Sequence, residues 1–193
     1  MRPEAAIRRL ERRGPELCVI AIFAVSAAIH LWWLHRFRAG FPLDIDESRY
    51  IAFGLALRDG LAADGPAGAW HAWAAQHDFG PLQPLVSVPL FLVFGRTVTT
   101  ALATPLVFLA LLLAASYGVG ARLTSRWGGV LAAGVVATAP GVIDFSRSYQ
   151  FPIAAAALLT PRRGRCWPPT VSHGAGGRSP SGSSSGSRCS RAR

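Results

Sequence analysis

Residues 17–34 form a long segment without a charged side chain, and this segment restricts the possible fold of the chain more than any other feature. It holds about 18 residues, and a helix of that length crosses most of the roughly 30 Å hydrocarbon core of a bilayer. Arginines precede it, and Trp32 and Trp33 stand near its far end, where a membrane interface favours tryptophan. A cleaved signal peptide is the alternative, but its apolar core has only about 7–15 residues. The segment predicts an uncleaved membrane helix, with residues 1–16 as a basic cytoplasmic N-terminus.

The composition favours a membrane protein over a soluble one. Apolar residues make up 51% of the chain and charged residues only 16%, compared with roughly 25% charged residues in a soluble domain. The net charge of +10 comes from arginines that are concentrated near the two ends, so it does not by itself indicate nucleic-acid binding, and we expect no nucleic-acid partner. The three cysteines have no metal-binding or disulfide spacing.

The apolar pattern predicts an all-α fold, a polytopic transmembrane helical protein. Residues 36–96 are more polar and predict an external loop with short helices. Within this loop, residues 82–94 are apolar but too short to span a bilayer, and they contain prolines, so they predict a juxtamembrane segment. Further apolar segments follow in a membrane module that covers residues 17–160: spans at 97–119 and 129–143, and an incomplete span at 151–160.

The loop that contains Arg122 and Arg126 decides between two topologies. If residues 82–94 cross the membrane, this loop lies outside, against the rule that basic loops stay in the cytoplasm. If residues 82–94 only enter the interface, the two arginines lie inside. The loop at 144–150 then returns to the external side, where Asp46 lies. We adopt the second topology.

The tail, residues 161–193, differs from the rest of the chain. It is rich in Arg, Ser, Gly and Pro, has no Asp or Glu, and interrupts an apolar run after about ten residues. This composition cannot bury a core and predicts disorder. We interpret the tail as an out-of-frame translation that truncates a longer protein. A genuine basic tail is the alternative.

Acidic residues are scarce, with 10 in the chain, and three of them lie close together just after the first apolar segment. The spacing of Asp44 and Glu47 is that of a helix capping box. Asp46 does not take part in the capping-box spacing. Its alternative explanation is a solvated turn. Arg49 stands beside it and either pairs with Asp46 or contacts an anion. A carboxylate at a membrane surface can act as a general base or hold a divalent cation such as Mg²⁺ or Mn²⁺. The tryptophans Trp70 and Trp73 suit sugar stacking and interfacial anchoring equally well.

These features together resemble the GT-C membrane glycosyltransferases, specifically the branch of the protein O-mannosyltransferases and aminoarabinose transferases (families 39 and 83). The resemblance covers roughly residues 5–160, the N-terminal module of a longer enzyme. The motifs that carry it are Asp46-Glu47-Ser48-Arg49-Tyr50, the stretch His77 to Leu82 with its His and Pro-Leu, Val93-Phe94-Gly95 and Ser146-Arg147.

The resemblance implies transfer of a sugar from a polyprenyl-phosphate donor on the external face of the membrane. Asp46 is then the catalytic or metal-linked residue and Glu47 its partner, with substrate contacts from Arg49, Tyr50 and Arg147. An interfacial anchor is an equal alternative for Arg147. The family has an acid several residues after the Ser-Arg pair, whereas this chain has Phe151-Pro152.

The sequence therefore predicts a fragment of an integral-membrane glycosyltransferase in the inner (plasma) membrane, inactive as this chain stands. Its partners would be the lipid-linked donor and the bilayer. A transporter or flippase for lipid-linked material is one alternative, but it predicts ionisable residues inside the spans, and His30 is the nearest case. A non-catalytic membrane protein is the other alternative, and it would tolerate alanine at Asp46 and Glu47.

Overall fold

The computed structural model describes residues 3–38, 42–76, 80–150 and 152–165, with side chains described between residues 13 and 160 of these ranges. Within them the chain is helical and contains no β-strand, so the all-α prediction is confirmed for this part. The helices, in chain order, are α1 (Pro3–Trp33), the π-helical turn η1 (Leu34–Arg38), α2 (Ile45–Ala74), α3 (Leu82–Phe94), α4 (Val98–Ala103), α5 (Pro105–Leu123), α6 (Arg126–Thr138), α7 (Pro140–Ser146) and α8 (Pro152–Arg165).

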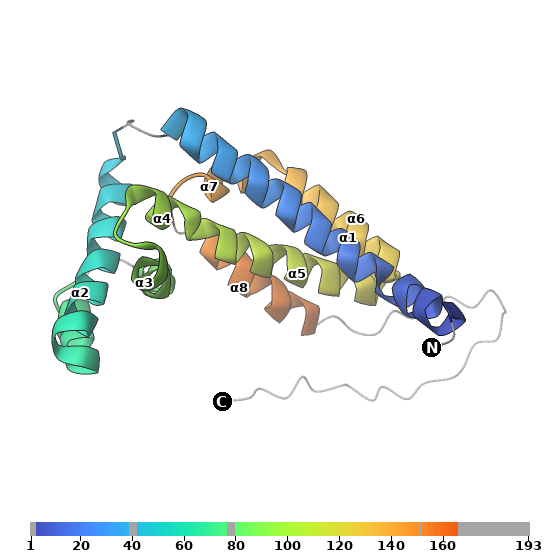
Figure 1. The fold of residues 1–193 in the computed structure, drawn as a ribbon, viewed down its shortest axis with the longest axis horizontal. Helices are drawn as coiled ribbons and strands as arrows, with labels where there is room; N and C mark the ends of the chain where they lie inside the picture. The colour runs from blue at the N-terminus through green and yellow to red at the C-terminus, as the bar shows by residue number, and fades with distance from the viewer. Residues whose placement is uncertain (1–2, 39–41, 77–79, 151, 166–193) are drawn as a thin grey trace, which may run out of the picture.

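The helices form a bundle with a crosswise layer at one end (Figure 1). α5 lies in the middle of the bundle and packs against α6, α8 and α1. Its buried face supplies Phe108, Leu109, Leu112 and Leu113, which contact Ile153, Ala154 and Ala157 of α8. α2 and α3 pack against each other at the end of the bundle where α1 finishes.

Two helical stretches are long and apolar enough to cross a membrane, Arg13–Arg38 and Val98–Leu123, with 26 residues each. At 1.5 Å per residue each measures about 39 Å, which exceeds the roughly 30 Å of the hydrocarbon core. α6 and α7 together would make a third span, but they are bent by 63° at Ala139. Large apolar side chains on the outside of the bundle remain exposed, including Ile20 (60%) on α1 and Leu131 (71%) on α6.

The bend between α6 and α7 differs from the continuous span expected at 129–143. Ala139 is extended, with φ −64° and ψ 126°, and Pro140 begins α7. Proline lacks an N–H and disfavours helical geometry in the residue before it, so the chain turns here. Helical hydrogen bonding resumes after the bend, where the N–H of Ile143 donates to the carbonyl oxygen of Ala139 at 3.0 Å.

The polar segment after α1 forms two helical arms that are joined by a kink within α2. α2 covers 30 residues, with non-helical geometry at Asp64 and Gly65, where the φ of Gly65 is +63°. The chain folds back at this point, so that Gly60 and Gly68 place their backbones against each other. A Cβ atom on either glycine would overlap the carbonyl group of the other. The absence of a side chain therefore permits this close contact.

α3 corresponds to the predicted juxtamembrane segment, and the end of α8 concerns the predicted start of the tail. α3 is 13 residues long and ends before Gly95, whose φ of +88° suits glycine. It is too short to count among the candidate spans. α8 continues to Arg165, five residues past the boundary expected at Thr160. The predicted disorder of the tail after Arg165 lies outside the described residues.

Candidate functional site

The candidate site is built on the first turn of α2, where the predicted capping box is present. The Asp44 carboxylate accepts a hydrogen bond from the backbone N–H of Glu47, which is the first half of the box, and another from that of Ile45 at 2.7 Å. In return, Oε2 of Glu47 accepts one from the backbone N–H of Asp44 at 3.2 Å. Both halves of the box are formed. The first helical N–H groups have no partner within the helix, so these side chains stabilise the start of α2.

Glu47 is more than a cap, because it joins three segments. Its side chain is buried, with 1% exposed, and forms an ion pair with Arg38 at the end of η1. Its other oxygen, Oε1, accepts a hydrogen bond from the backbone N–H of Tyr149 at 3.0 Å. The carboxylate thus fixes the end of η1, the start of α2 and the connection between α7 and α8. Its predicted role as a catalytic partner of Asp46 stays a prediction.

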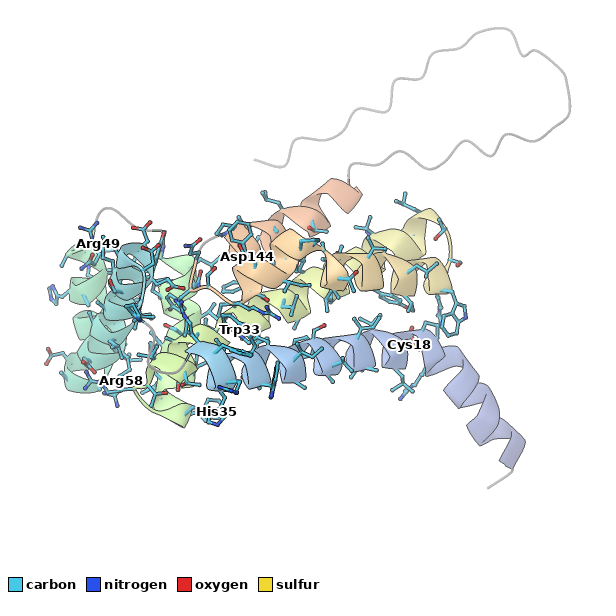
Figure 2. All side chains as sticks on the ribbon, turned by 90° about the horizontal axis from the view of Figure 1, so that it is seen from above. Cys18, Trp33, His35, Arg49, Arg58 and Asp144 are labelled. Atoms are coloured by element: carbon cyan, nitrogen blue, oxygen red, sulfur yellow. The ribbon has the colours of Figure 1, made fainter. Side chains whose placement is uncertain are left out.

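Asp46 lies on the same turn in the opposite environment. It is exposed, and its carboxylate forms no hydrogen bond or ion pair with another residue that the structure describes. Arg49, one turn further on, is also exposed. Figure 2 shows Arg49 toward the α2 end of the molecule, with Cys18 of α1 toward the other end. An exposed carboxylate on a fixed helical turn remains accessible to a substrate.

Tyr50 is half-buried and packs against the apolar cluster that joins η1, α2 and α4. This cluster includes Leu34, Ile51 and Leu102. The packing of Tyr50 against this cluster gives the start of α2 a second attachment, independent of the Glu47 carboxylate.

Arg147 lies beside the end of α1. Its guanidinium carbon is 4.9 Å from the centre of the Trp33 ring, within the range of a cation–π contact. Ser146 before it is buried and donates to the carbonyl oxygen of Ile143 at 2.9 Å. In the described part of the chain Arg147 has no carboxylate within ion-pair distance. The Ser-Arg pair therefore faces α1, and Glu47 links the same loop to α2 through Tyr149.

Sequence reasoning missed two partners of Glu47. Arg38 precedes the acidic turn, and its charge was the only signal that could have pointed to an ion pair. Tyr149 contributes a backbone N–H, which leaves no signal in the sequence. Its fully buried hydroxyl donates to the carbonyl oxygen of Gln83 at 3.4 Å. Burial raises the pKa of Tyr149 to about 12, although the hydroxyls of Ser87 and Thr104 act in the opposite direction.

The described residues do not form a cage for the metal ion expected at Asp46. Nowhere in the described ranges do three or more His, Cys, Asp or Glu side chains gather at one point. Of the three acids at the start of α2, Asp44 and Glu47 are engaged in the capping box, which leaves one available carboxylate. A cation at Asp46 would depend on donors from a substrate, such as phosphate oxygens.

Some residues that carry the resemblance fall outside the described ranges, namely His77, Asp78, Phe79 and Phe151. Asp144, the acid nearest the Ser-Arg pair, is exposed on α7. Trp70 is 65% exposed on the second arm of α2, and Trp73 packs against the cluster of Phe53, Leu57 and Val88.

Comparisons with protein-family models, with curated proteins and with solved structures find no match to this chain. The resemblance to GT-C glycosyltransferases therefore stays a prediction, and it depends on the motif from Asp46 to Tyr50.

Proposed function

We propose that this chain is a multi-pass membrane protein whose basic segments lie together on the cytoplasmic side. The contacts of Glu16 support this arrangement. Its Oε1 lies 3.8 Å from a guanidinium nitrogen of Arg126, and the Tyr117 hydroxyl donates to it at 3.2 Å. The loop between α5 and α6 thus lies at the same end of the bundle as the start of the apolar segment of α1. The acidic turn of α2 lies at the other end (Figure 1). The arginines of residues 1–16 and of the loop with Arg122 and Arg126 would then face the cytoplasm, which suits the positive-inside rule.

We further propose that the acidic end serves glycosyl transfer from a polyprenyl-phosphate sugar on the external face. One observation supports this best: Glu47 fixes the first turn of α2 while Asp46, on the same turn, keeps an exposed carboxylate without a partner among the described residues. A general base needs such a fixed and accessible position.

In the proposed reaction, Asp46 accepts the proton of an acceptor hydroxyl. The hydroxyl oxygen forms a bond to the anomeric carbon of the sugar, and the bond from that carbon to the phosphate oxygen breaks. The lipid phosphate leaves with the electron pair of that bond. Arg49, on the same exposed face, provides a positive charge for the phosphate. Tyr50 positions this turn through its packing.

The topology can be tested with single cysteines at Asp46 and at Arg122. A maleimide that cannot cross the membrane is applied to intact cells and to inverted membrane vesicles of a cysteine-free version of the chain. We expect Asp46→Cys to react in intact cells and Arg122→Cys to react only in inverted vesicles. Reaction of Asp46→Cys from the cytoplasmic side alone would remove the basis of the proposed function.

The chemistry is tested by sugar transfer from polyprenyl-phosphate donors in membranes that contain this polypeptide alone. The sequence leads us to expect no turnover by the chain as it stands. Turnover that Asp46→Asn abolishes would show that this expectation of inactivity is wrong and would support Asp46 as the base. Asp144→Asn is the matched control, because it removes an exposed acid from α7. Turnover that survives Asp46→Asn would contradict the proposed chemistry.

A non-catalytic membrane protein is the second candidate, and the engagement of Asp44 and Glu47 favours it. Both carboxylates have a structural role, so the acidic cluster needs a functional explanation only for Asp46. The two candidates differ in what Asp46→Ala does in a longer relative that is active. Loss of transfer favours the transferase, and full retention favours the non-catalytic protein.

A further inference from the structure

An apolar cleft runs along the bundle between α1 and the bent pair α6 and α7. Its volume is about 480 Å³. The lining is mostly aliphatic, with Ile22, Val25 and Ile29 from α1 and Gly134, Ala137 and Val142 from α6 and α7. The bend at Ala139 contributes to it, because α7 turns away from the line of α6. Small residues on α6 leave the space that a larger side chain would fill.

One end of this cleft is polar and positively charged. His30, Ser146 and Arg147 line it there, next to Trp33. Arg147 is half-buried and has no carboxylate partner in the part of the chain that is described. A partly buried guanidinium without an anion favours binding one, because its five N–H groups match the oxygens of a phosphate.

His30 adds an unused polar atom at the same end. Its side chain is 2% exposed, and Nε2 lies 3.2 Å from the carbonyl oxygen of Leu102. A carbonyl oxygen can only accept, so Nε2 carries the proton and donates. Nδ1 is buried and has no partner among the described residues. In the neutral ring Nδ1 is an acceptor, which suits a hydroxyl group of a ligand or a water molecule bound with it.

The size of the cleft indicates which ligand fits. From Ala21 to His30 the lining of α1 rises about 14 Å, roughly half the thickness of the hydrocarbon core and so about one leaflet. The cleft volume of about 480 Å³ lies within the roughly 300–1,000 Å³ of ordinary ligand pockets. These dimensions match one acyl chain of an ordinary phospholipid. A polyprenyl chain is several times longer and would extend far beyond the cleft.

We propose that this cleft is a binding site for an anionic diacyl phospholipid, with one acyl chain between α1 and α6 and the phosphate at Arg147. A headgroup that carries a hydroxyl, as in phosphatidylglycerol, also provides a donor for Nδ1 of His30. The inference rests on the proposed placement of α1 and α5 in a bilayer and is independent of sugar transfer. The site is separate from the carboxylate of Asp46 on α2.

The test is native mass spectrometry of the full chain, purified in detergent and titrated with phosphatidylglycerol, phosphatidylcholine, a polyprenyl phosphate or inorganic phosphate. We expect one phosphatidylglycerol to bind about tenfold more tightly than phosphatidylcholine, because the choline cation of phosphatidylcholine offsets the attraction between its phosphate and Arg147 and offers no hydroxyl to His30. Inorganic phosphate should not displace it, because it lacks the chain that fills the cleft.

Two variants and one control locate the lipid. Arg147→Gln should remove the preference for phosphatidylglycerol, whereas Arg122→Gln, which neutralises an exposed arginine at the end of α5, should keep it. Gly134→Leu should fill the cleft and prevent binding of either lipid. Its Cβ would meet Ile22 at 4.0 Å, an ordinary contact, and leucine favours a helix, so this variant should still fold.

Each of three results would overturn the proposal. The first is an equal affinity for phosphatidylglycerol and phosphatidylcholine. The second is an unchanged preference in Arg147→Gln. The third is displacement of phosphatidylglycerol by polyprenyl phosphate at a lower concentration, which would assign the cleft to the sugar donor. None of these results bears on the labelling of position 46, so the two proposals can fail separately.

Discussion

At the scale of single residues, two neighbouring acids in the first turn of α2 lie in opposite environments. Glu47 is 1% exposed and paired with Arg38, whereas Asp46 is exposed. The sequence predicted the capping role of Glu47, because Asp44 and Glu47 have a recognised local spacing. It did not predict the contact with Tyr149, since no local pattern relates residues 102 positions apart.

We expect Glu47→Gln to lower the free energy of unfolding by about 2–4 kcal/mol, because it leaves the partly buried Arg38 without its counter-charge. Asp46→Asn should change it by less than about 0.5 kcal/mol, as is usual for an exposed position. Both are measured by denaturant unfolding in detergent micelles. An equal loss in the two variants would mean that Glu47 does not stabilise the loop in the way described.

The buried hydroxyl of Tyr149, which lies between α7 and α8 outside the candidate spans, should make stability depend on pH. Its pKa is about 12 in the folded chain, compared with about 10 for an exposed tyrosine. Below about pH 10 both states keep the proton, and the stability is fully present. As the pH rises from about 10 to 12, only the unfolded state loses the proton, so stability falls by on the order of 2 kcal/mol.

Tyr149→Phe should lack this fall. It should cost about 1 kcal/mol at neutral pH through the lost hydrogen bond to Gln83, and its stability should then vary less across the alkaline range. The measurement is the unfolding free energy of both proteins as a function of pH. Parallel curves would show that another group causes the alkaline loss.

At the scale of elements, the apolar pattern indicated long helices but not the breaks within them. Residues 17–34 fall inside the first candidate span, and the range 97–119 begins one residue before the second, because a long uncharged run has few other structures available. The bend at Pro140 was missed, although proline is a local signal, because the apolar pattern continues through it. The fold-back of α2 was missed since it depends on two glycines that meet only in three dimensions.

The contact between Gly60 and Gly68 can be tested with alanine. Gly60→Ala and Gly68→Ala should each destabilise the chain by about 1–3 kcal/mol, because the new Cβ overlaps the facing backbone. Gly118→Ala on α5 is the control: its Cβ meets nothing within 4 Å, so it should be neutral or stabilise by up to about 1 kcal/mol. Thermal unfolding in detergent compares the three. A stabilising effect of Gly60→Ala would contradict the close approach.

At the scale of the whole molecule, the exposed apolar surface and the two charged ends fit a bilayer. Val25 (60%) on α1 and Val135 (69%) on α6 are among the large side chains left uncovered on the bundle. We expect the full chain to remain in the membrane pellet after an alkaline carbonate wash and to be released by detergent, because lipid would cover these side chains. Release by carbonate alone would show that the helices do not span the membrane.

The hydrogen bond between Glu47 and Tyr149 also has a consequence for biosynthesis. A ribosome adds about 5–20 residues per second, so Tyr149 is made roughly 5–20 seconds after Glu47, which precedes it by 102 positions. Arg38 and Asp44 are synthesised before Glu47 and can pair with it at once. A nascent chain that stalls before residue 149 would therefore hold its acidic turn by two attachments, and the third would form only after translation resumes.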